Sequence, residues 1–517
     1  MNTKALRQKI LDLAIRGKLV PQDPNDEPAS VLLDRIREQK QQMVKEGKLK
    51  KKDIKNDSVI FVDEDNLHYE KFADGSVKCI EDEIPFELPE GWCWARLKHI
   101  CMMAAGKAKS SDQIKSEPFD GCYPCFGGNG IRGYVDKYNQ EGTFSIVGRQ
   151  GALCGNINIA SGKFYATEHA VVTTLFNGID FDWSNYTLEA LKLNEYATGA
   201  AQPGLSVANV LNVFVPVPPT QEQIYIGHQI SKSIKIIENI TDEKEDLQTL
   251  ISAAKSKILD LAIHGQLIPQ NPDDEPASVL LERIRAEKEE LIKRGKIKRD
   301  KKESIIFKGE DNSYYEKIGS EVHCIDEEIP FEIPKTWEWL RLQNCCVKEI
   351  KRGKSPKYTI ESSNTLVFAQ KCNTKYNGID IGLAQYLDES ILGKYPTDEY
   401  MQDGDIVINS TGTGTLGRVG FYQSSDNIKS IDIVPDSHVT VVRSYNEVDS
   451  FYLYAFMKSN QSKLEKKGEG STNQKELKPA TLKEMLAPIP SISEQERISL
   501  AIQKAFSIIN TIEKSLS

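Results

Sequence analysis

Residues 9–39, KILDLAIRGKLVPQDPNDEPASVLLDRIREQ, return almost unchanged as residues 257–287, KILDLAIHGQLIPQNPDDEPASVLLERIRAE. A second repeated segment follows each copy: residues 84–94 read IPFELPEGWCW, and residues 329–339 read IPFEIPKTWEW. Repeats of this length indicate that one structural unit occurs twice, which decides the architecture before any single helix or strand is assigned. The chain is therefore a duplication.

A third repeated segment closes each copy: PVPPTQEQ at residues 216–223 corresponds to PIPSISEQ at residues 488–495. The stretches between the second and third segments differ in sequence, and the second stretch is longer. We call the repeated segments the frame and the stretches between them the inserts. A repeated frame around two different inserts is expected of a protein whose inserts recognise two different targets.

A heptad pattern of apolar residues begins after the first PVPPTQEQ segment. Two apolar rows that repeat every seven positions are typical of a coiled-coil helix. The helix is predicted from about Glu222 to His264, with Gly265 ending it, and at 1.5 Å per residue it would be roughly 60–65 Å long. The residues that form its predicted apolar seam are Ile230, Ile237, Ile240, Leu247, Ile251 and Ile258.

The second copy of this helix is divided between the two ends of the chain. Residues 494–517 align with 222–245, and residues 1–15 align with 249–263, so the duplication is circular. We expect Ser517 to lie near Met1, and the two long apolar seams to pair antiparallel, because an unpaired seam of this length would be insoluble. A pseudo-twofold rod with one insert at each end follows.

The inserts show a different pattern from the helices. Short β-branched stretches bounded by Gly and Asn turns predict strands, and longer amphipathic stretches predict helices. Strands are expected at residues 143–147, 169–173, 405–409 and 438–442, and helices at about 183–193 and 451–464. The predicted fold class is α+β, with two mixed α/β inserts joined by a pair of long antiparallel coiled-coil helices.

Five segments are expected along the chain. They are a helical repeat with a basic linker (1–83), the first insert (84–220), a central coiled-coil helix with a linker (221–328), the second insert (329–490) and a C-terminal helix that pairs with the central one (491–517).

Composition excludes several classes of protein. The chain has 517 residues, of which 39% are hydrophobic and 27% charged, and no apolar run approaches the length of a membrane helix. The first residues lack a secretory signal, and ten cysteines without regular spacing suit a reducing compartment, so we expect the cytoplasm. The net charge of −9 argues mildly against a nucleic-acid partner, although lysines and arginines cluster at residues 48–55 and 293–302.

Three motifs invite an enzyme interpretation, and each lacks its context. Residues 126–130, FGGNG, fit a methyltransferase cofactor loop, but no Pro-Pro-aromatic catalytic motif occurs in the chain. Residues 412–417 fit GxGxxG, yet a strand is predicted after them instead of the helix that would bind a pyrophosphate. Asp436 with Glu465 and Lys467 fits a nuclease only loosely, because the latter two lie on a predicted helix.

Histidines and cysteines offer no better catalytic candidate. His169 and His438 occupy similar places in the two inserts and are predicted to pack at the start of a strand. Cys122 and Cys125 form the one CxxC motif, but no second pair at ligand spacing accompanies it, so no metal site is expected.

Glycine-rich loops that carry Arg, Gln, Asn and Thr remain as candidates for binding. Such loops let the backbone approach a ligand, and these side chains can donate to base edges, while lysines suit phosphates. Tight turns between strands would produce similar loops. The candidate DNA-binding residues are Lys107, Lys109, Asn129, Arg132, Arg149, Gln150, Gln202, Lys351, Arg352, Lys354, Thr411, Thr413, Thr415, Arg418 and Gln474.

The repeated KILDLAI helix, the PFExPxxWxW segments, the GRQGALCG and STGTGTLGR loops and the PxP…EQ segments together resemble the specificity subunits of type I restriction-modification enzymes. The resemblance covers essentially the whole chain. It departs at residues 470–477, GSTNQKEL, which keep only part of the pattern of residues 199–206, GAAQPGLS.

The resemblance implies that each insert is a target-recognition domain that reads one half of a bipartite site in double-stranded DNA. It implies that the helices fix the spacer and dock two modification subunits, which would carry S-adenosylmethionine and methylate adenine N6 on a flipped base. Restriction subunits with ATP and magnesium would complete the complex, and this chain itself would bind no cofactor or metal and have no catalytic residue.

Two rival functions remain open. A single-chain enzyme would methylate or cleave DNA alone, and a pure scaffold would show no sequence preference even with its partners. The scaffold does not explain why the frames are kept while the inserts differ.

Overall fold

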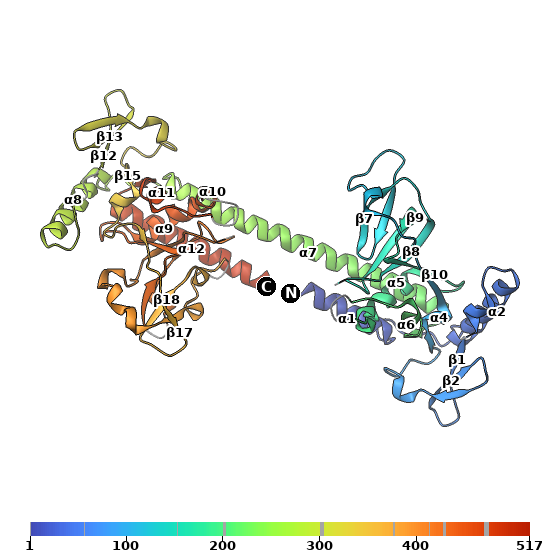
Figure 1. Ribbon diagram of the computed structural model, residues 1–517. Helices are drawn as coiled ribbons and strands as arrows, with labels where there is room; N and C mark the ends of the chain where they lie inside the picture. Colours follow the sequence, from blue (N-terminus) through green and yellow to red (C-terminus); the bar gives the residue numbers. More distant parts are fainter. Residues whose placement is uncertain are drawn as a thin grey trace. The chain divides into compact units, whose positions relative to one another are not determined.

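The computed structural model describes residues 2–55, 57–151, 153–199, 203–299, 304–375, 378–412, 414–427, 431–469 and 475–516. The chain divides into two compact units, residues 1–245 and 246–517, coloured blue to green and green to red in Figure 1. Each predicted insert falls within one unit. The prediction that Ser517 lies near Met1 concerns residues outside the described ranges and stays a prediction.

Helices and strands mix in the first unit, as predicted. Its helices are α1 (Thr3–Ile15), α2 (Ala29–Lys45), α3 (Lys51–Ile54), α4 (Leu97–Ile100), α5 (Phe181–Ala190), α6 (Val207–Val210) and the start of α7 (Thr220–Ile263). Its strands are β1 (Ser58–Val62), β2 (His68–Phe72), β3 (Val77–Cys79), β4 (Cys93–Arg96), β5 (Cys101–Ala105), β6 (Tyr123–Gly127), β7 (Gly130–Val135), β8 (Gln140–Gly148), β9 (Ile157–Ala166), β10 (Ala170–Leu175) and β11 (Phe214–Val217).

A six-stranded sheet in the order β5-β10-β8-β9-β6-β7 forms the first insert. All its pairs are antiparallel except β6 with β9. The strands predicted at 143–147 and 169–173 lie in β8 and β10. The helix predicted at 183–193 corresponds to α5, which ends three residues earlier. On α5, Trp183 and Leu188 are buried in a core that Ile226 and Ile230 of α7 share, so the insert packs directly on the long helix.

The second unit repeats this frame with a different insert. Its helices are the end of α7, α8 (Ala277–Lys293), α9 (Ser450–Ser459), α10 (Gln461–Lys466), α11 (Pro479–Lys483) and α12 (Ile492–Leu516). Its strands are β12 (Ser304–Lys308), β13 (Tyr314–Ile318), β14 (Glu321–Cys324), β15 (Glu338–Arg341), β16 (Lys351–Arg352), β17 (Tyr358–Thr359), β18 (Thr365–Phe368), β19 (Gln385–Leu387), β20 (Ile406–Asn409), β21 (Val419–Phe421), β22 (Asp432–Pro435), β23 (Val439–Val442) and β24 (Leu486–Ile489).

Two four-stranded sheets replace the six-stranded sheet in the second insert, in the orders β16-β23-β20-β21 and β17-β19-β18-β22. The strands predicted at 405–409 and 438–442 lie in β20 and β23, and the helix predicted at 451–464 is present as α9 and α10. The inserts therefore differ in sheet topology as well as in sequence.

Each unit has a three-stranded antiparallel sheet: β1-β2-β3 follows α3 in the first unit, and β12-β13-β14 follows α8 in the second. Residues 1–83 were expected to form a helical repeat and a basic linker, and the first of these sheets, which was not predicted, lies within that segment. Its strands are three to five residues long, and such short runs leave too weak a period to separate a strand from a charged linker.

The same hydrogen bonds hold the frame of both units. The indole Nε1 of Trp92 donates to Glu222 at 2.8 Å, and that of Trp337 donates to Glu494 at 3.0 Å. Burial raises the pKa of both carboxyl groups. The repeated sequence segments thus meet in equivalent contacts, the PFExPxxWxW segment against the PxP…EQ segment.

The next glutamine of each PxP…EQ segment repeats a second contact. The side-chain oxygen of Gln223 accepts from the backbone N–H of Asp180, which caps α5, at 2.9 Å. The side-chain oxygen of Gln495 accepts from Asp449, which caps α9, also at 2.9 Å. Each frame therefore anchors the helix of its own insert.

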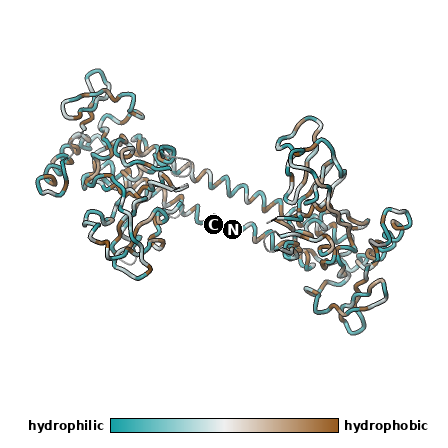
Figure 2. The backbone as a smooth tube through the Cα atoms, viewed as in Figure 1, coloured by the Kyte–Doolittle hydropathy of each residue, from teal (hydrophilic) through white to brown (hydrophobic). Residues whose placement is uncertain are grey.

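The long helix α7 spans Thr220–Ile263, within two residues of the predicted bounds. Of its predicted seam residues, Ile230, Ile237 and Ile251 are buried, while Ile240, Leu247 and Ile258 are half-buried. Hydrophobic and hydrophilic residues alternate along α7 in Figure 2. None of the helices in the described ranges is long and apolar enough to cross a membrane.

A buried polar network attaches the three-stranded sheet of the first unit to its neighbours. Glu70 on β2 is 1% exposed and accepts from Arg96 Nε and Nη2 at 2.9 and 2.6 Å. Ser58 donates to Glu70 and lies 3.2 Å from Nε2 of His99. Burial, and next the positive charge of Lys40, lower the pKa of His99 well below its usual range.

The second unit keeps the ion pair and replaces the histidine. Arg341 donates to Glu316 at 3.0 and 2.6 Å, and Asn344 stands where the first unit has His99. The side-chain amide of Asn344 donates to the backbone oxygen of Ser304 at 3.2 Å. The imidazole of His99 thus has no counterpart at the equivalent position of the second unit.

Replacing His99 with asparagine is expected to make the first unit less sensitive to acid. In the unfolded chain the imidazole takes up a proton near pH 6.5, whereas the folded state holds it neutral, so stability falls as the pH drops below about 6.5. At pH 5.5 the loss approaches about 1.4 kcal/mol. Urea unfolding of wild type and His99→Asn at pH 7.5 and 5.5 measures it; an equal pH dependence in both proteins would contradict the prediction.

Candidate nucleic-acid interface

Three segments of the first insert meet around the loop that follows β8. The backbone N–H of Arg149 donates to the oxygen of His169 at 2.9 Å, and the N–H of Leu205 donates to the oxygen of Arg149 at 2.8 Å. The loop at 148–151 is therefore held between the turn before β10 and the segment before α6. Two of these three segments were predicted from the sequence to contact DNA.

The second insert repeats this arrangement after β20. The N–H of Ser410 donates to the oxygen of His438 at 2.8 Å, and the N–H of Leu477 donates to the oxygen of Ser410 at 2.9 Å. Although the two inserts differ in sheet topology, their candidate loops are built by the same backbone hydrogen bonds.

Glycines allow the lysine-bearing segments to cross these turns closely. A Cβ on Gly106 would lie 2.1 Å from the backbone oxygen of Ala166, and one on Gly353 would lie 2.2 Å from that of Pro435. Each glycine immediately precedes a predicted phosphate-binding lysine, Lys107 or Lys354. The close approach places each lysine beside the candidate loop of its own unit.

The candidate residues of the first insert are the more accessible ones. Lys107, Asn129, Arg132 and Gln150 are exposed, whereas Lys109 and Arg149 are half-buried. Several of them contact neighbouring residues. Arg132 donates to Ser111 Oγ at 2.8 Å, and Arg149 Nε donates to the backbone oxygen of Leu205 at 3.2 Å. Asn129 accepts from Asn156 at 2.9 Å, and Lys109 lies 3.4 Å from Asp136.

Most cationic candidates of the second insert are engaged within the protein. Lys351 forms an ion pair with Glu399 at 2.8 Å, and Arg352 pairs with Glu476. Burial would raise the pKa of Glu399, but its hydrogen bond with Lys351 and the charge of Lys348 outweigh burial, and its pKa is lowered. These pairings differ from the expectation of free phosphate-binding cations, because their acidic partners lie 48 and 124 positions away.

Arg418 and the threonines of the same loop also have internal partners. Arg418 donates to the backbone oxygens of Asn373 and Gly414 at 2.8 and 3.1 Å, and Thr415 donates to that of Thr411 at 3.1 Å. Lys354 donates to the oxygen of Lys394. These bonds shape the loop, and Thr411 and Thr415 remain half-buried at its surface.

Three of the predicted DNA-binding residues lie outside the described ranges: Gln202, Thr413 and Gln474.

The two histidines that were predicted to pack, and one further residue that the sequence did not indicate, lie beside the candidate loops. His438 is exposed, not packed as expected, and its Nδ1 lies 2.8 Å from Thr411 Oγ1. His169 is half-buried and lies 3.3 Å from Glu168. Their matching positions in the two inserts were the available signal. Gln370, 3.4 Å from Thr411 Oγ1, had no such signal.

The three motifs that invited an enzyme interpretation do not lie in the structural context that each enzyme would require. β21 follows the GxGxxG segment, and Glu465 lies on α10. Asp436 is 2% exposed, and burial raises its pKa. All ten cysteines are free, and among the described residues no three His, Cys, Asp or Glu side chains lie together as metal ligands would.

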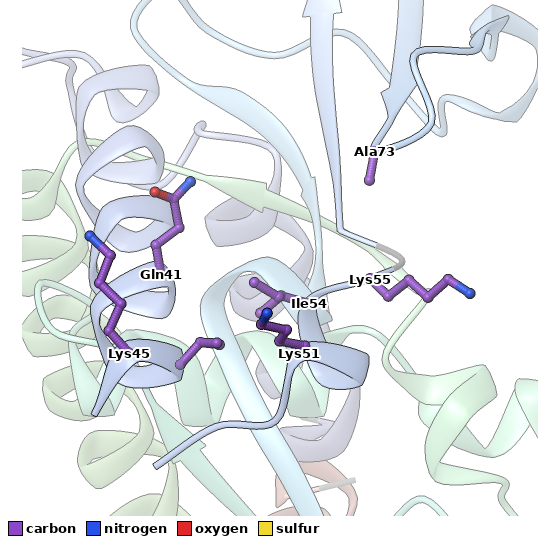
Figure 3. A pocket seen from close by; sticks show the side chains of 7 residues that line it. Gln41, Lys45, Lys51, Ile54, Lys55 and Ala73 are labelled. Carbon is purple, nitrogen blue, oxygen red and sulfur yellow. The ribbon is translucent and has the colours of Figure 1, made fainter. Parts of the chain in front are cut away.

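The first lysine cluster of the sequence borders an open hollow of about 640 Å³ between α2, α3 and the turn after β2. Figure 3 shows Lys45 extending from α2, with Lys51 and Ile54 next to each other on α3 and Lys55 farther from Lys45. Because the hollow is wide open, it does not have the form of the enclosed cleft that binds a small molecule.

Comparison with known proteins identifies the repeated unit. The family described as "Type I restriction modification DNA specificity domain" matches residues 89–249 and again 334–517, once in each repeat. The EcoEI specificity subunit of Escherichia coli is 27% identical over 523 residues, covering 87% of this chain and 79% of that protein. The EcoprrI specificity subunit of Escherichia coli is 45% identical over 149 residues, covering 28% of this chain and 37% of that protein.

A solved structure from work on complex assembly and conformational transition of the type I R-M system shares the fold. It covers 84% of this chain and 94% of its own, with a TM-score of 0.50 and 13% identity. Because the family match recurs in both repeats, the chain belongs to the specificity subunits of type I restriction-modification systems, the non-catalytic components of those systems.

Proposed function

We propose that each insert is a target-recognition domain that reads one half of a bipartite DNA site. The observation that carries the proposal is the pairing of equivalent frames with unlike inserts: the Trp92–Glu222 and Trp337–Glu494 contacts recur, while the sheets that they support do not. A subunit that positioned one target twice would need two like inserts. Sequence is read mainly through base edges in the major groove, which loops at the end of a rigid sheet can reach.

We place the reading surface at the loops after β8 and β20. In the first insert the exposed Lys107, Arg132 and Gln150 would contact DNA. In the second, Thr411 with His438 stands at the corresponding place, and Lys351, Arg352 and Arg418 support the loop. Because the second loop offers fewer free cations, its phosphate contacts would be fewer and its binding less sensitive to salt.

The helix α7, with α1 and α12, would set the unspecified spacer. A 44-residue helix is about 66 Å long, enough to hold two heads one or more DNA turns apart. The antiparallel pairing, the pseudo-twofold relation of the units and the docking of two modification subunits along the seam residues belong to this proposal. S-adenosylmethionine, ATP and magnesium would reside on the partner subunits.

A chain with one insert duplicated tests the two-headed assignment. Residues 84–220 are replaced by residues 329–492, which align with them at both ends, so that Trp337 takes the place of Trp92 and can donate to Glu222 as Trp92 does. With the matching modification subunit, genome-wide mapping of methyladenine should reveal one bipartite motif for the natural chain. The duplicated-insert chain should methylate a motif whose two halves are the same sequence in inverted orientation.

The reciprocal chain, in which a second copy of residues 84–220 replaces residues 329–492, serves as the control and should yield the other half-site twice. A motif that stayed unchanged after either exchange would contradict two-headed reading. A motif with two identical halves in direct orientation would still support reading by two inserts, but it would contradict the antiparallel pairing of the long helices. Methylation without any motif would favour a scaffold.

A further inference from the structure

The three-stranded sheet of each unit has one face turned away from the core. In the first unit the strand register places Phe61, Tyr69 and Cys79 in one row across this face and Val59, Lys71 and Val77 in the next. The opposite face carries the buried Ser58 and Glu70. We call these six residues the outer face of the first unit.

The second unit presents the same outer face. Its register places Phe307, Tyr315 and Cys324 in one row, and Ile305, Lys317 and Val322 in the next. Five of the six residue types are identical, and the sixth changes only from valine to isoleucine. The Phe–Tyr pair is stacked in both units, with ring centroids 6.0 and 5.9 Å apart.

Other exposed positions of the same sheets have diverged. Val62 corresponds to Lys308, and Leu67 corresponds to Ser313. Val62 is 54% exposed, as much as Val77 on the outer face at 53%, and yet only Val77 keeps its type. Exposure alone therefore does not decide which positions are kept, and the retention of the outer face favours a role for it.

Folding of the sheet does not account for this retention. Val77 and Val322 remain about half exposed, and Ile305 and Phe307 are also exposed, so these side chains gain little from burial within the chain. Exposed apolar residues gathered on one face are typical of an interaction site. Lys71 and Lys317 are exposed among them and have no ion-pair partner among the described residues.

We propose that the two outer faces bind two copies of one protein partner, through an apolar surface that carries a carboxylate opposite Lys71 and Lys317. The inference rests on the proposed function, in which the modification subunit is the partner present twice, and it adds the outer faces to the docking along α7. The inserts differ because they meet different DNA, whereas the outer faces agree because they meet the same protein. A single cation in each apolar face suits a protein interface and not a phosphate backbone.

The natural cysteines provide a direct test without any substitution. Cys79 and Cys324 are exposed on the outer faces, and the other eight cysteines are buried or half-buried. Alkylation by N-ethylmaleimide, followed by mass spectrometry, should slow at least about tenfold at both cysteines when a purified modification subunit is added. Protection of neither cysteine, or equal protection by DNA alone or by self-association of this chain, would overturn the proposal.

A pair of variants measures the contribution of the face to affinity. Val77→Glu with Val322→Glu should weaken binding of the modification subunit at least about tenfold, because each glutamate would be buried against an apolar surface. Val77→Glu alone should leave one of two subunits bound. The control is Val62→Glu, at a position equally exposed but outside the face, and it should bind as wild type does.

Two outcomes separate this inference from the proposed function. If the wild-type complex methylates a bipartite motif and the double variant binds its partner normally, the docking face is wrong and two-headed reading stands. If the wild-type chain neither binds the modification subunit nor directs methylation, both proposals fail.

Discussion

Replacing Arg443 with methionine is expected to lower the local stability of the second insert by about 3–5 kcal/mol, because it leaves a buried carboxylate unpaired. Asp405 is fully buried and accepts from Arg443 Nε and Nη2, both at 2.7 Å. Arg443 also donates to the backbone oxygen of Tyr400 at 2.7 Å. The pair joins the ends of β20 and β23, the strands that carry the candidate loop of the second unit. Hydrogen–deuterium exchange of these two strands measures the change.

Arg283→Met is the matched control for this substitution. Arg283 also binds two acidic side chains, Glu275 and Glu447, but more than a third of its side chain is exposed. A surface pair of this kind contributes at most about 1 kcal/mol. Removing both members of the buried pair, Arg443→Met with Asp405→Leu, should restore part of the loss. Equal effects of Arg443→Met and Arg283→Met would contradict the prediction.

Replacing Gly155 or Gly417 with alanine is expected to displace the candidate loop of its unit. Both glycines have positive φ, 85° and 76°, where an L side chain is strained by about 1–3 kcal/mol. In addition, a Cβ on Gly155 would lie 2.3 Å from the backbone N of Asn194, and one on Gly417 would lie 2.6 Å from that of Glu465. These contacts are with backbone atoms that cannot rotate away, so overpacking adds about 1–3 kcal/mol.

Two glycines in the same loops separate the strain from the collision. Gly151 and Gly414 have φ of 90° and 75°, and a Cβ on either would meet nothing within 4 Å. Gly151→Ala and Gly414→Ala should therefore show the conformational strain alone. Thermal unfolding and methylation of a natural site would be measured for all four variants, and Gly155→Ala should impair one half-site while Gly417→Ala impairs the other. Equal behaviour of the four variants would rule out the collision.

Periodicity explains what could be predicted along the chain. The bounds of α7 were predicted within two residues because the heptad is long and Gly265 ends it. The strands β8, β10, β20 and β23 were found because β-branched residues and flanking turns mark them. The three-stranded sheets were missed, since their strands are short and lie next to lysine-rich segments.

The candidate site was predicted less completely, because a side chain's partner is set by folding. Arg352 and Lys351 were chosen for their charge, and the fold pairs them with Glu476 and Glu399. His438 was expected to pack, and the fold instead exposes it beside Thr411.

The amino-acid sequence by itself determined that the chain is a circular duplication, that a long helix follows the first insert, and that each unit carries a mixed α/β insert. These properties follow from sequence repeats and periodic patterns of residues, which can be recognised without a tertiary structure. Only the tertiary structure decided that Trp92 and Trp337 bind Glu222 and Glu494, that most cations of the second loop are engaged, and that the residues kept in both small sheets lie on one face. Those facts depend on which distant residues meet, because hydrogen bonds, ion pairs and exposed faces form between segments that the sequence does not place together.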